Sequence, residues 1–183
     1  MKAKPAIILL VLIFVGPIVL SWFFVNSDIN WTERGLSNHG VLITPPLDLR
    51  DNEHTKAIFD HAKLAPSHWA IISFTTGACA EECRAGIDKL LDIHAVMGSS
   101  TDRTRVFGLA PSGKADAGQP LLVDSAAVGA LEKLLRAQIP DIVFPQFLVV
   151  DWRQQLMLRF PNQAPPDDIK DDLSKLLRAS KIR

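Results

Sequence analysis

The chain has 183 residues, 48% of them hydrophobic, which is enough for one domain of ordinary size and one further hydrophobic segment. Its 20 acidic and 20 basic residues cancel, so no overall positive field would attract nucleic acid or an anionic lipid surface. The length therefore argues against two full domains, and the charge balance argues against a nucleic-acid partner.

The N-terminal segment Pro5–Val25 carries no charge and is long enough to cross a membrane. A membrane helix needs about 20 apolar residues, whereas the apolar region of a cleaved signal peptide usually has about 7 to 15 and ends at a small-residue cleavage site. The sequence Ser-Trp-Phe-Phe near the end of this segment offers no such site. We therefore expect residues 1–25 to hold a cytoplasmic start and one uncleaved transmembrane helix.

The charges that flank this segment predict its orientation. Lys2 and Lys4 precede it and Asp28 and Glu33 follow it, and flanking positive residues usually remain in the cytoplasm. The rest of the chain is then exported. Since so short a start leaves no room for an organelle transit peptide, we expect a bacterial inner membrane protein whose domain faces the periplasm, where disulfides form.

Residues 26–46 are polar and contain glycines and prolines without a sustained period, which predicts a tether. The domain is expected to occupy residues 47–183. It begins with a possible strand at 47–50, and the stretch up to residue 65 is irregular or helical.

Trp69–Thr75 is a short apolar run rich in strand-forming residues, and it predicts a buried strand. A helix that stops by Gly98 is expected next, because apolar residues recur at helical spacing at Cys83, Ile87, Leu90 and Leu91. Thr104–Ala110 is a second apolar run. A strand, a helix and a strand in this order predict a parallel crossover, the signature of an α/β fold.

The second half of the domain adds a helix, a hairpin and a final helix. The first helix begins after a capping residue, Asp124 or Ser125, and carries an apolar stripe at Val128, Leu131, Leu134 and Leu135. Gln146–Val150 and Gln155–Phe160 flank a short polar turn and predict an antiparallel hairpin. In the final helix, about residues 166–180, acidic residues come first and basic residues last, which suits the helix dipole. This complete order predicts a thioredoxin-like fold.

Cys79 and Cys83 are the only cysteines, and they lie between the first predicted strand and the helix that follows it. Amides at a helix N-terminus favour a thiolate, whereas Glu81 and Glu82 should raise the thiol pKa. A spacing of four allows a disulfide, but so short a loop would stabilise the fold by only about 2 kcal/mol. Redox or metal chemistry is therefore favoured over structural roles, and Cys79, which is nearer the loop, is the expected attacking thiolate.

A metal site would need more ligands than the two cysteines. Cu(I) suits thiolates and is often completed by imidazole, but no histidine follows residue 94. His94 lies about 16 Å from Cys83 along a helix axis, too far to share a metal. His68 precedes the strand and should lie at its other end, and His39, His54 and His61 are in regions without a predicted placement.

At this point the chain resembles the Sco/SenC group of membrane-anchored, thioredoxin-fold proteins that assist the copper centre of cytochrome c oxidase. The likeness rests on the single anchor, the pair Pro45 and Pro46, the strand leading into CxxxC at Cys79 and Cys83, and the hairpin followed by a terminal helix. Residues 155–183 look still more like a Sco-related subgroup of small transmembrane proteins associated with bacterial oxidase assembly.

The resemblance implies thiol-disulfide exchange at Cys79 and Cys83 in oxidase assembly, with oxidase subunits or assembly factors as partners. Thioredoxin-like folds hold a cis-proline beside the active cysteines, and Pro145, directly ahead of the first hairpin strand, is the candidate for that catalytic role. Sco proteins bind copper through two cysteines and a late histidine, and this sequence has no histidine there. The alternatives are a Cu(I) chaperone that uses Cys79 and Cys83 alone or with a borrowed ligand, and a non-catalytic accessory protein.

Overall fold

The computed structural model describes residues 13–19, 21–22, 38–62 and 67–180. The chain divides into two units, Met1–Ser37 and Asn38–Arg183. In the first unit, residues 13–19 and 21–22 are helical. No helix among the described residues combines the length and apolar character needed to span a membrane, and most of the predicted anchor Pro5–Val25 lies outside them. The anchor therefore stays a prediction.

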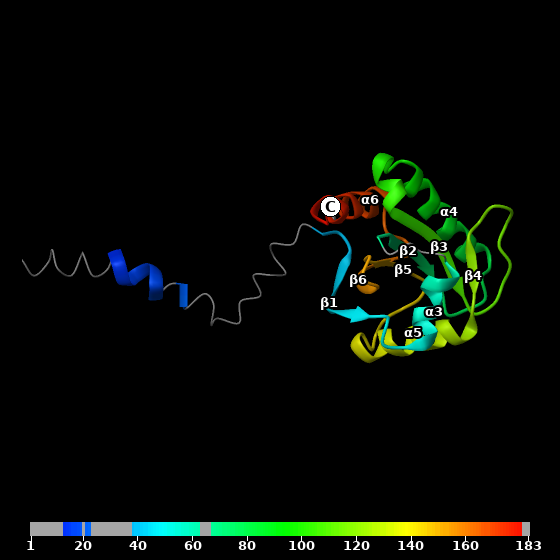
Figure 1. Ribbon diagram of the computed structural model, residues 1–183, viewed down its shortest axis with the longest axis horizontal. Helices are drawn as coiled ribbons and strands as arrows, with labels where there is room; N and C mark the ends of the chain where they lie inside the picture. Colours follow the sequence, from blue (N-terminus) through cyan, green and yellow to red (C-terminus); the bar gives the residue numbers. More distant parts are fainter. Residues whose placement is uncertain (1–12, 20, 23–37, 63–66, 181–183) are drawn as a thin grey trace, which may run out of the picture. The chain divides into compact units, whose positions relative to one another are not determined.

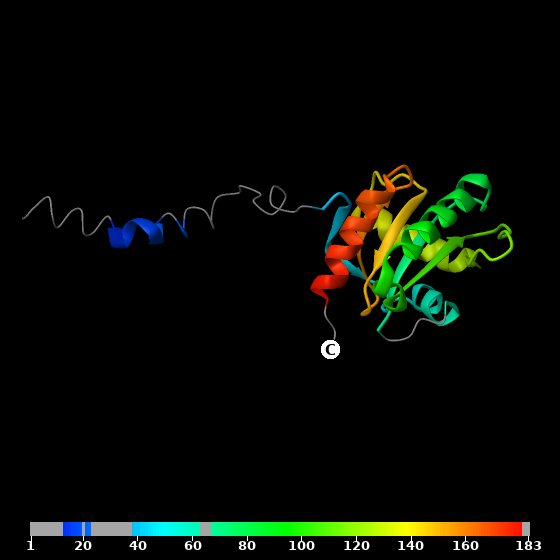
Figure 2. The ribbon, with the colours of Figure 1, turned by 90° about the horizontal axis from the view of Figure 1, so that it is seen from above.

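The second unit is built around a six-stranded sheet with the order β1-β6-β5-β2-β3-β4 (Figures 1 and 2). The strands are β1 (Val41–Asp48), β2 (Trp69–Phe74), β3 (Thr104–Ala110), β4 (Leu121–Val123), β5 (Gln146–Val150) and β6 (Gln155–Pro161). β3 runs parallel to β2 and β4, whereas the other neighbouring strands are antiparallel. The predicted parallel crossover and the predicted hairpin are both confirmed.

Two pairs of helices cover the two faces of this sheet (Figure 1). One face carries α4 (Glu81–Ala95) and α6 (Pro166–Ala179), and the other carries α3 (Glu53–His61) and α5 (Ser125–Gln138). A short 3-10 helix, η1 (Gly98–Arg103), leads from α4 to β3. All six residues of the inner strand β2 are buried, which explains why its sequence is apolar throughout rather than alternating.

The structure differs from the sequence-based expectation at both edges of the sheet. β1 begins at Val41, so residues 41–46, for which the sequence predicts a tether, instead form part of a strand. Prolines are tolerated there because β1 is an edge strand, and its pairing with β6 shifts register between Leu42 and Leu47. The other edge strand, β4, was not predicted, since its three residues are too few to establish a period. Helix α3 occupies most of the stretch up to residue 65, for which the sequence predicts an irregular or helical conformation.

The start of β1 is fastened to α6. The carboxylate of Asp172, whose side chain is 1% exposed, accepts hydrogen bonds from the backbone N–H groups of His39 and Gly40 at 2.7 and 2.8 Å. Asp168 adds a contact of 3.5 Å to Nδ1 of His39. A buried carboxylate is stable only where such donors pair with it, so these bonds fix the beginning of the domain against α6.

Candidate functional site

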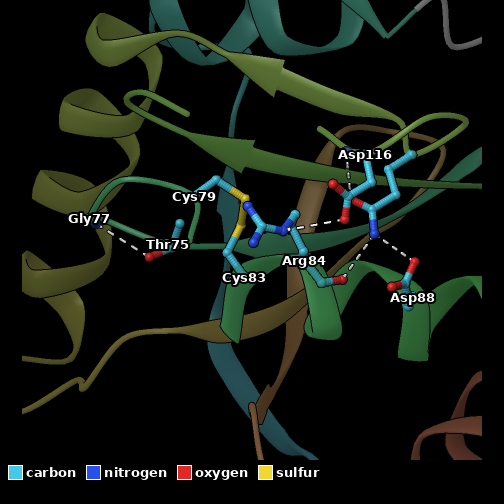
Figure 3. Close-up of a disulfide and its surroundings, with 8 residues drawn as sticks. Thr75, Gly77, Cys79, Cys83, Arg84, Asp88 and Asp116 are labelled. Atoms are coloured by element: carbon cyan, nitrogen blue, oxygen red, sulfur yellow. Dashed lines mark hydrogen bonds and ion pairs between the residues drawn. A yellow bond between two sulfur atoms is a disulfide. The ribbon is translucent and has the colours of Figure 1, made fainter. Parts of the chain in front are cut away.

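Cys79 and Cys83 lie where β2 leads into α4. β2 ends at Phe74, and α4 begins at Glu81 after an N-cap residue, Ala80, whose side chain makes no capping hydrogen bond. The two cysteines form a disulfide with a Cα–Cα distance of 5.1 Å (Figure 3). The juxtaposition of two sulfur atoms that the sequence predicts at this junction is therefore present.

Both cysteines are buried, each with only 5% of its surface exposed. Cys83 belongs to α4 and shares a small apolar cluster with Ile87, one turn later, and with Ala110 at the end of β3. Cys79 is in the connection before the helix, and its chain neighbours Ala78 and Ala80 are exposed. The greater exposure that would favour Cys79 as the attacking thiolate is thus missing in the disulfide form.

The cover over Cys79 is the β3–β4 loop, residues 111–120. The backbone N–H of Cys79 donates to the carbonyl oxygen of Ser112 over 2.8 Å, and Cys79 forms an isolated parallel bridge with Gly113. Gly113 has a φ of +131°, and a Cβ at this position would lie 2.7 Å from the Cβ of Cys79. The loop approaches the disulfide this closely because residue 113 has no side chain.

Side chains of the same loop also reach the first turns of α4. The carboxylate of Asp116 lies 3.3 Å from Nε of Arg84, the residue that follows Cys83. Gln119 donates from Nε2 to the carboxylate of Asp88 over 2.6 Å and to the carbonyl oxygen of Arg84 over 3.4 Å. Figure 3 shows Arg84 beside the disulfide, with Asp116 next to Arg84 and Asp88 farther along the helix. The loop is therefore held to α4 at two residues that follow Cys83, Arg84 and Asp88.

The acidic residues predicted to influence the thiols are in the first turn of α4. Glu81 is exposed, and Glu82 accepts a hydrogen bond from Nδ2 of Asn162 over 3.2 Å. The cysteines do not titrate while they are bonded to each other. The expectation that Glu81 and Glu82 raise the pKa of a thiol concerns the reduced protein and stays a prediction.

Pro145 directly precedes β5, and the peptide bond between Phe144 and Pro145 is cis. In the antiparallel pairing of β2 with β5, Phe74 lies opposite Gln146. Pro145 is therefore at the end of the sheet from which the chain leads to Cys79. Its action beside the cysteines during exchange stays a prediction.

Within the described residues, no group of three or more His, Cys, Asp or Glu side chains is placed to hold a metal ion. Nε2 of His94 lies 3.3 Å from the carbonyl oxygen of Thr104, at the end of α4 remote from the cysteines, and His68 precedes β2 at the other end of that strand. The sulfur atoms are joined in a disulfide rather than available as thiolates. These residues do not form a three-ligand copper site, and Cu(I) would require the reduced pair.

A comparison with protein families decides the classification of the domain. The family described as "Transmembrane-like, thioredoxin-like, C-terminal domain" matches residues 69–180, which is more than half of the chain. The chain belongs to this family. The thioredoxin-like fold expected from the sequence is thereby confirmed. The match begins with β2 and ends with α6, so it contains the cysteine pair, the β3–β4 loop and Pro145.

Several solved structures are similar to this member of the family. The thioredoxin domain of a thiol-disulfide oxidoreductase from Bacteroides vulgatus is 14% identical, with 75% of this chain and 93% of that chain covered and a TM-score of 0.39. BsSco, a member of the Sco family of cytochrome c oxidase assembly proteins, is 16% identical, with coverage of 63% and 83% and a TM-score of 0.42. ScoI of Bradyrhizobium japonicum with copper bound is 13% identical, with coverage of 59% and 84% and a TM-score of 0.39.

These similarities are too distant to carry a statement about function. A search among curated proteins found no significant match. The finer resemblance to Sco proteins therefore rests on the sequence features described above.

The sequence reasoning missed the residues that cover the disulfide. The segment PSGKADAGQP contains four of them: Ser112, Gly113, Asp116 and Gln119. Its glycines and prolines predict a loop, but they do not indicate which residues the loop contacts. Arg84 was also missed, because a basic residue in the first turns of a helix is usually just a solvated side chain.

Proposed function

We propose that this protein is a membrane-tethered thiol-disulfide exchange protein that serves cytochrome c oxidase assembly in the bacterial periplasm. The observation that carries the proposal is the bonded pair Cys79–Cys83 at the junction of β2 and α4, in a domain of a thioredoxin-like family. This junction places a disulfide at a helix N-terminus, where backbone amides stabilise a thiolate after reduction.

The exchange proceeds by thiolate attack on a disulfide sulfur. A partner thiolate bonds to one sulfur of the pair, the Cys79–Cys83 bond breaks, and the released cysteine leaves as a thiolate that takes up a proton. A second thiolate of the partner then displaces the first cysteine. The partner dithiol is oxidised to a disulfide and the pair gains two electrons and two protons. In the reverse sequence the reduced pair is oxidised and a partner disulfide is reduced to a dithiol.

The location and the partner are supported by sequence features. The uncharged segment Pro5–Val25 has the length of a membrane span, and Lys2 and Lys4 ahead of it favour an exported domain. The motif at Cys79 and Cys83 and the final segment of residues 155–183 resemble Sco-related proteins of oxidase assembly.

The test uses the full chain in a bacterium that depends on it. Membranes are treated with acid, free thiols are labelled with a maleimide that adds mass, and the ratio of dithiol to disulfide is read on a gel under oxidising and reducing growth conditions. We expect the protein in the membrane fraction, with a ratio that follows the growth condition. Absence of the protein from the membranes would refute the membrane tether. A cysteine pair that stays oxidised under both growth conditions would refute the exchange function.

Cysteine variants test the link to the oxidase. Cys83→Ser leaves Cys79 to form a mixed disulfide that cannot be resolved, so we expect an adduct with a partner, a weaker adduct from Cys79→Ser, and loss of oxidase assembly in both. Asp171→Ala is the matched control, because this exposed residue of α6 is remote in sequence from the site. Oxidase activity and adducts on non-reducing gels are the measurements.

The burial of both cysteines favours a second candidate, a non-catalytic accessory protein with a fixed crosslink. In that case the double variant Cys79→Ser/Cys83→Ser would leave oxidase assembly intact. The Cu(I) chaperone is distinguished by titrating the reduced full chain with Cu(I), where stoichiometric binding that is lost in the double variant would favour it.

A further inference from the structure

We propose that the β3–β4 loop, residues 111–120, is a gate over the disulfide, fastened by Asp116 and Gln119, and that its opening uncovers Cys79 rather than Cys83. This inference rests on the proposed exchange function and adds its regulation. An exchange partner would then have to displace the loop, or wait for it to open, before it reaches sulfur.

The gate covers Cys79 specifically. Ser112 accepts the hydrogen bond from its N–H, and Gly113 lies so close that an added Cβ would be 2.7 Å from the Cβ of Cys79. The residues on either side of Cys79, Ala78 and Ala80, are exposed, so Cys79 lies near the surface of the domain, and the loop forms a layer over it. Removal of that layer would expose it.

Cys83 has a different cover. It lies on the buried face of α4, where Ile87 follows at helical spacing, and Ile87 is completely buried. The apolar cluster around the pair includes Ala110, which belongs to β3 and is also completely buried. Opening of the loop leaves this packing in place, so Cys83 becomes the leaving group and Cys79 the attacked sulfur.

The fastening is weak enough to open without unfolding the domain. Residues 112–118 of the loop are exposed, and none of them adds a side chain to the core. The ion pair between Arg84 and Asp116 joins side chains that are 34% and 67% exposed, and such pairs contribute little in water. A segment with few buried contacts and exposed hydrogen bonds opens more readily than the core.

The reaction that the gate controls can be followed with dithiothreitol. A thiolate of dithiothreitol bonds to Cys79, the Cys79–Cys83 bond breaks, and Cys83 leaves as a thiolate. The second thiol of dithiothreitol, as its thiolate, then closes the reagent into a cyclic disulfide and releases Cys79. Each pair gains two electrons and two protons. The two cysteines are the only ones in the chain, so the free thiols report this disulfide alone.

The experiment measures the rate of this reduction in the full chain, purified in detergent micelles and quenched with acid before maleimide labelling. Asp116→Ala/Gln119→Ala removes the fastening, which consists of one exposed ion pair and the two hydrogen bonds that Gln119 donates to α4. We expect reduction to be roughly tenfold faster, because each of these exposed contacts contributes little in water. Lys114→Ala is the matched control in the same loop, since Lys114 forms no hydrogen bond or ion pair with any described residue and should react at the wild-type rate.

Hydrogen exchange supplies a second readout. The amide of Cys79 donates to Ser112, so its exchange should accelerate in the double variant while amides of β2 stay protected. Equal reduction rates in wild type and double variant, or faster exchange throughout the sheet, would overturn the gate. If both tests support the gate but the cysteine pair never changes its redox state in cells, the gate stands and only the proposed function is refuted.

Discussion

At the scale of single residues, the packing around the disulfide depends on a glycine, whose lack of a side chain lets the loop approach Cys79. Gly113 has a φ of +131°, which disfavours other residues, and it also lies against Cys79, where a Cβ would be 2.9 Å from the backbone nitrogen and oxygen. Gly118 in the same loop has a φ of +89° but nothing within 4 Å of an added Cβ. A comparison of Gly113 with Gly118 therefore separates the effect of a positive φ from the effect of close approach to Cys79.

We expect Gly113→Ala to lower the free energy of unfolding by about 3 kcal/mol and Gly118→Ala by about 1 kcal/mol, because only the first adds a clash to the backbone strain. Urea unfolding of the two variants, with the disulfide intact, measures both losses. Equal losses would show that the approach of the loop to Cys79 is relaxed in solution.

At the scale of elements, the terminal helix and the first strand stabilise each other although they lie at opposite ends of the domain sequence. Asp172 of α6 accepts the N–H groups of His39 and Gly40, and Arg103 donates to the carbonyl oxygens of Leu177 and Ser180 at the end of the same helix. α6 is thereby held near its middle and at its C-terminal end, beside its apolar contacts with the sheet.

Asp172→Ala should cost about 2 to 4 kcal/mol of unfolding free energy, because it removes two hydrogen bonds to a charged acceptor and leaves a buried N–H of Gly40 without a partner. Asp171→Ala, on the exposed side of the helix, should stay within about 0.5 kcal/mol of the wild type. Urea denaturation compares the two. If Asp171→Ala loses as much unfolding free energy as Asp172→Ala, the stabilisation comes from the negative charge on the helix rather than from the buried hydrogen bonds.

At the scale of the whole domain, the disulfide is a small part of what holds the fold together. The two main apolar clusters lie on the two faces of the sheet and neither includes Cys79 or Cys83. The disulfide closes a loop with a sequence separation of only 4. Because neither main cluster includes a cysteine, we expect the core to persist when the disulfide is reduced.

Reduction should therefore lower the unfolding free energy by only about 2 kcal/mol and leave the far-ultraviolet circular dichroism unchanged. The measurement is urea unfolding with and without a phosphine reductant, with Cys79→Ser/Cys83→Ser as the variant that mimics the reduced state. Loss of secondary structure on reduction would instead assign the disulfide a structural role.

The element order could be predicted because local patterns record it. Buried runs such as Trp69–Thr75 and helical stripes such as that of α6 repeat the periods of strand and helix, and Asp124 caps α5 with hydrogen bonds to two backbone amides, as expected. The cysteine pair could be placed for the same reason, since its position follows from the strand before it and the helix after it.

The surroundings of the pair could not be predicted, because they depend on contacts between segments far apart in the chain. Nothing local to Cys79 indicates that Gly113 covers it, and nothing local to His39 indicates that Asp172 binds the start of β1. Periodicity indicates which face of a helix or strand is buried. Which residues cover that face is decided only when the folded sheet brings distant segments together. The local patterns of the sequence therefore determined the element order of a thioredoxin-like domain and the position of the cysteine pair, whereas tertiary packing alone decided that the pair is bonded and covered.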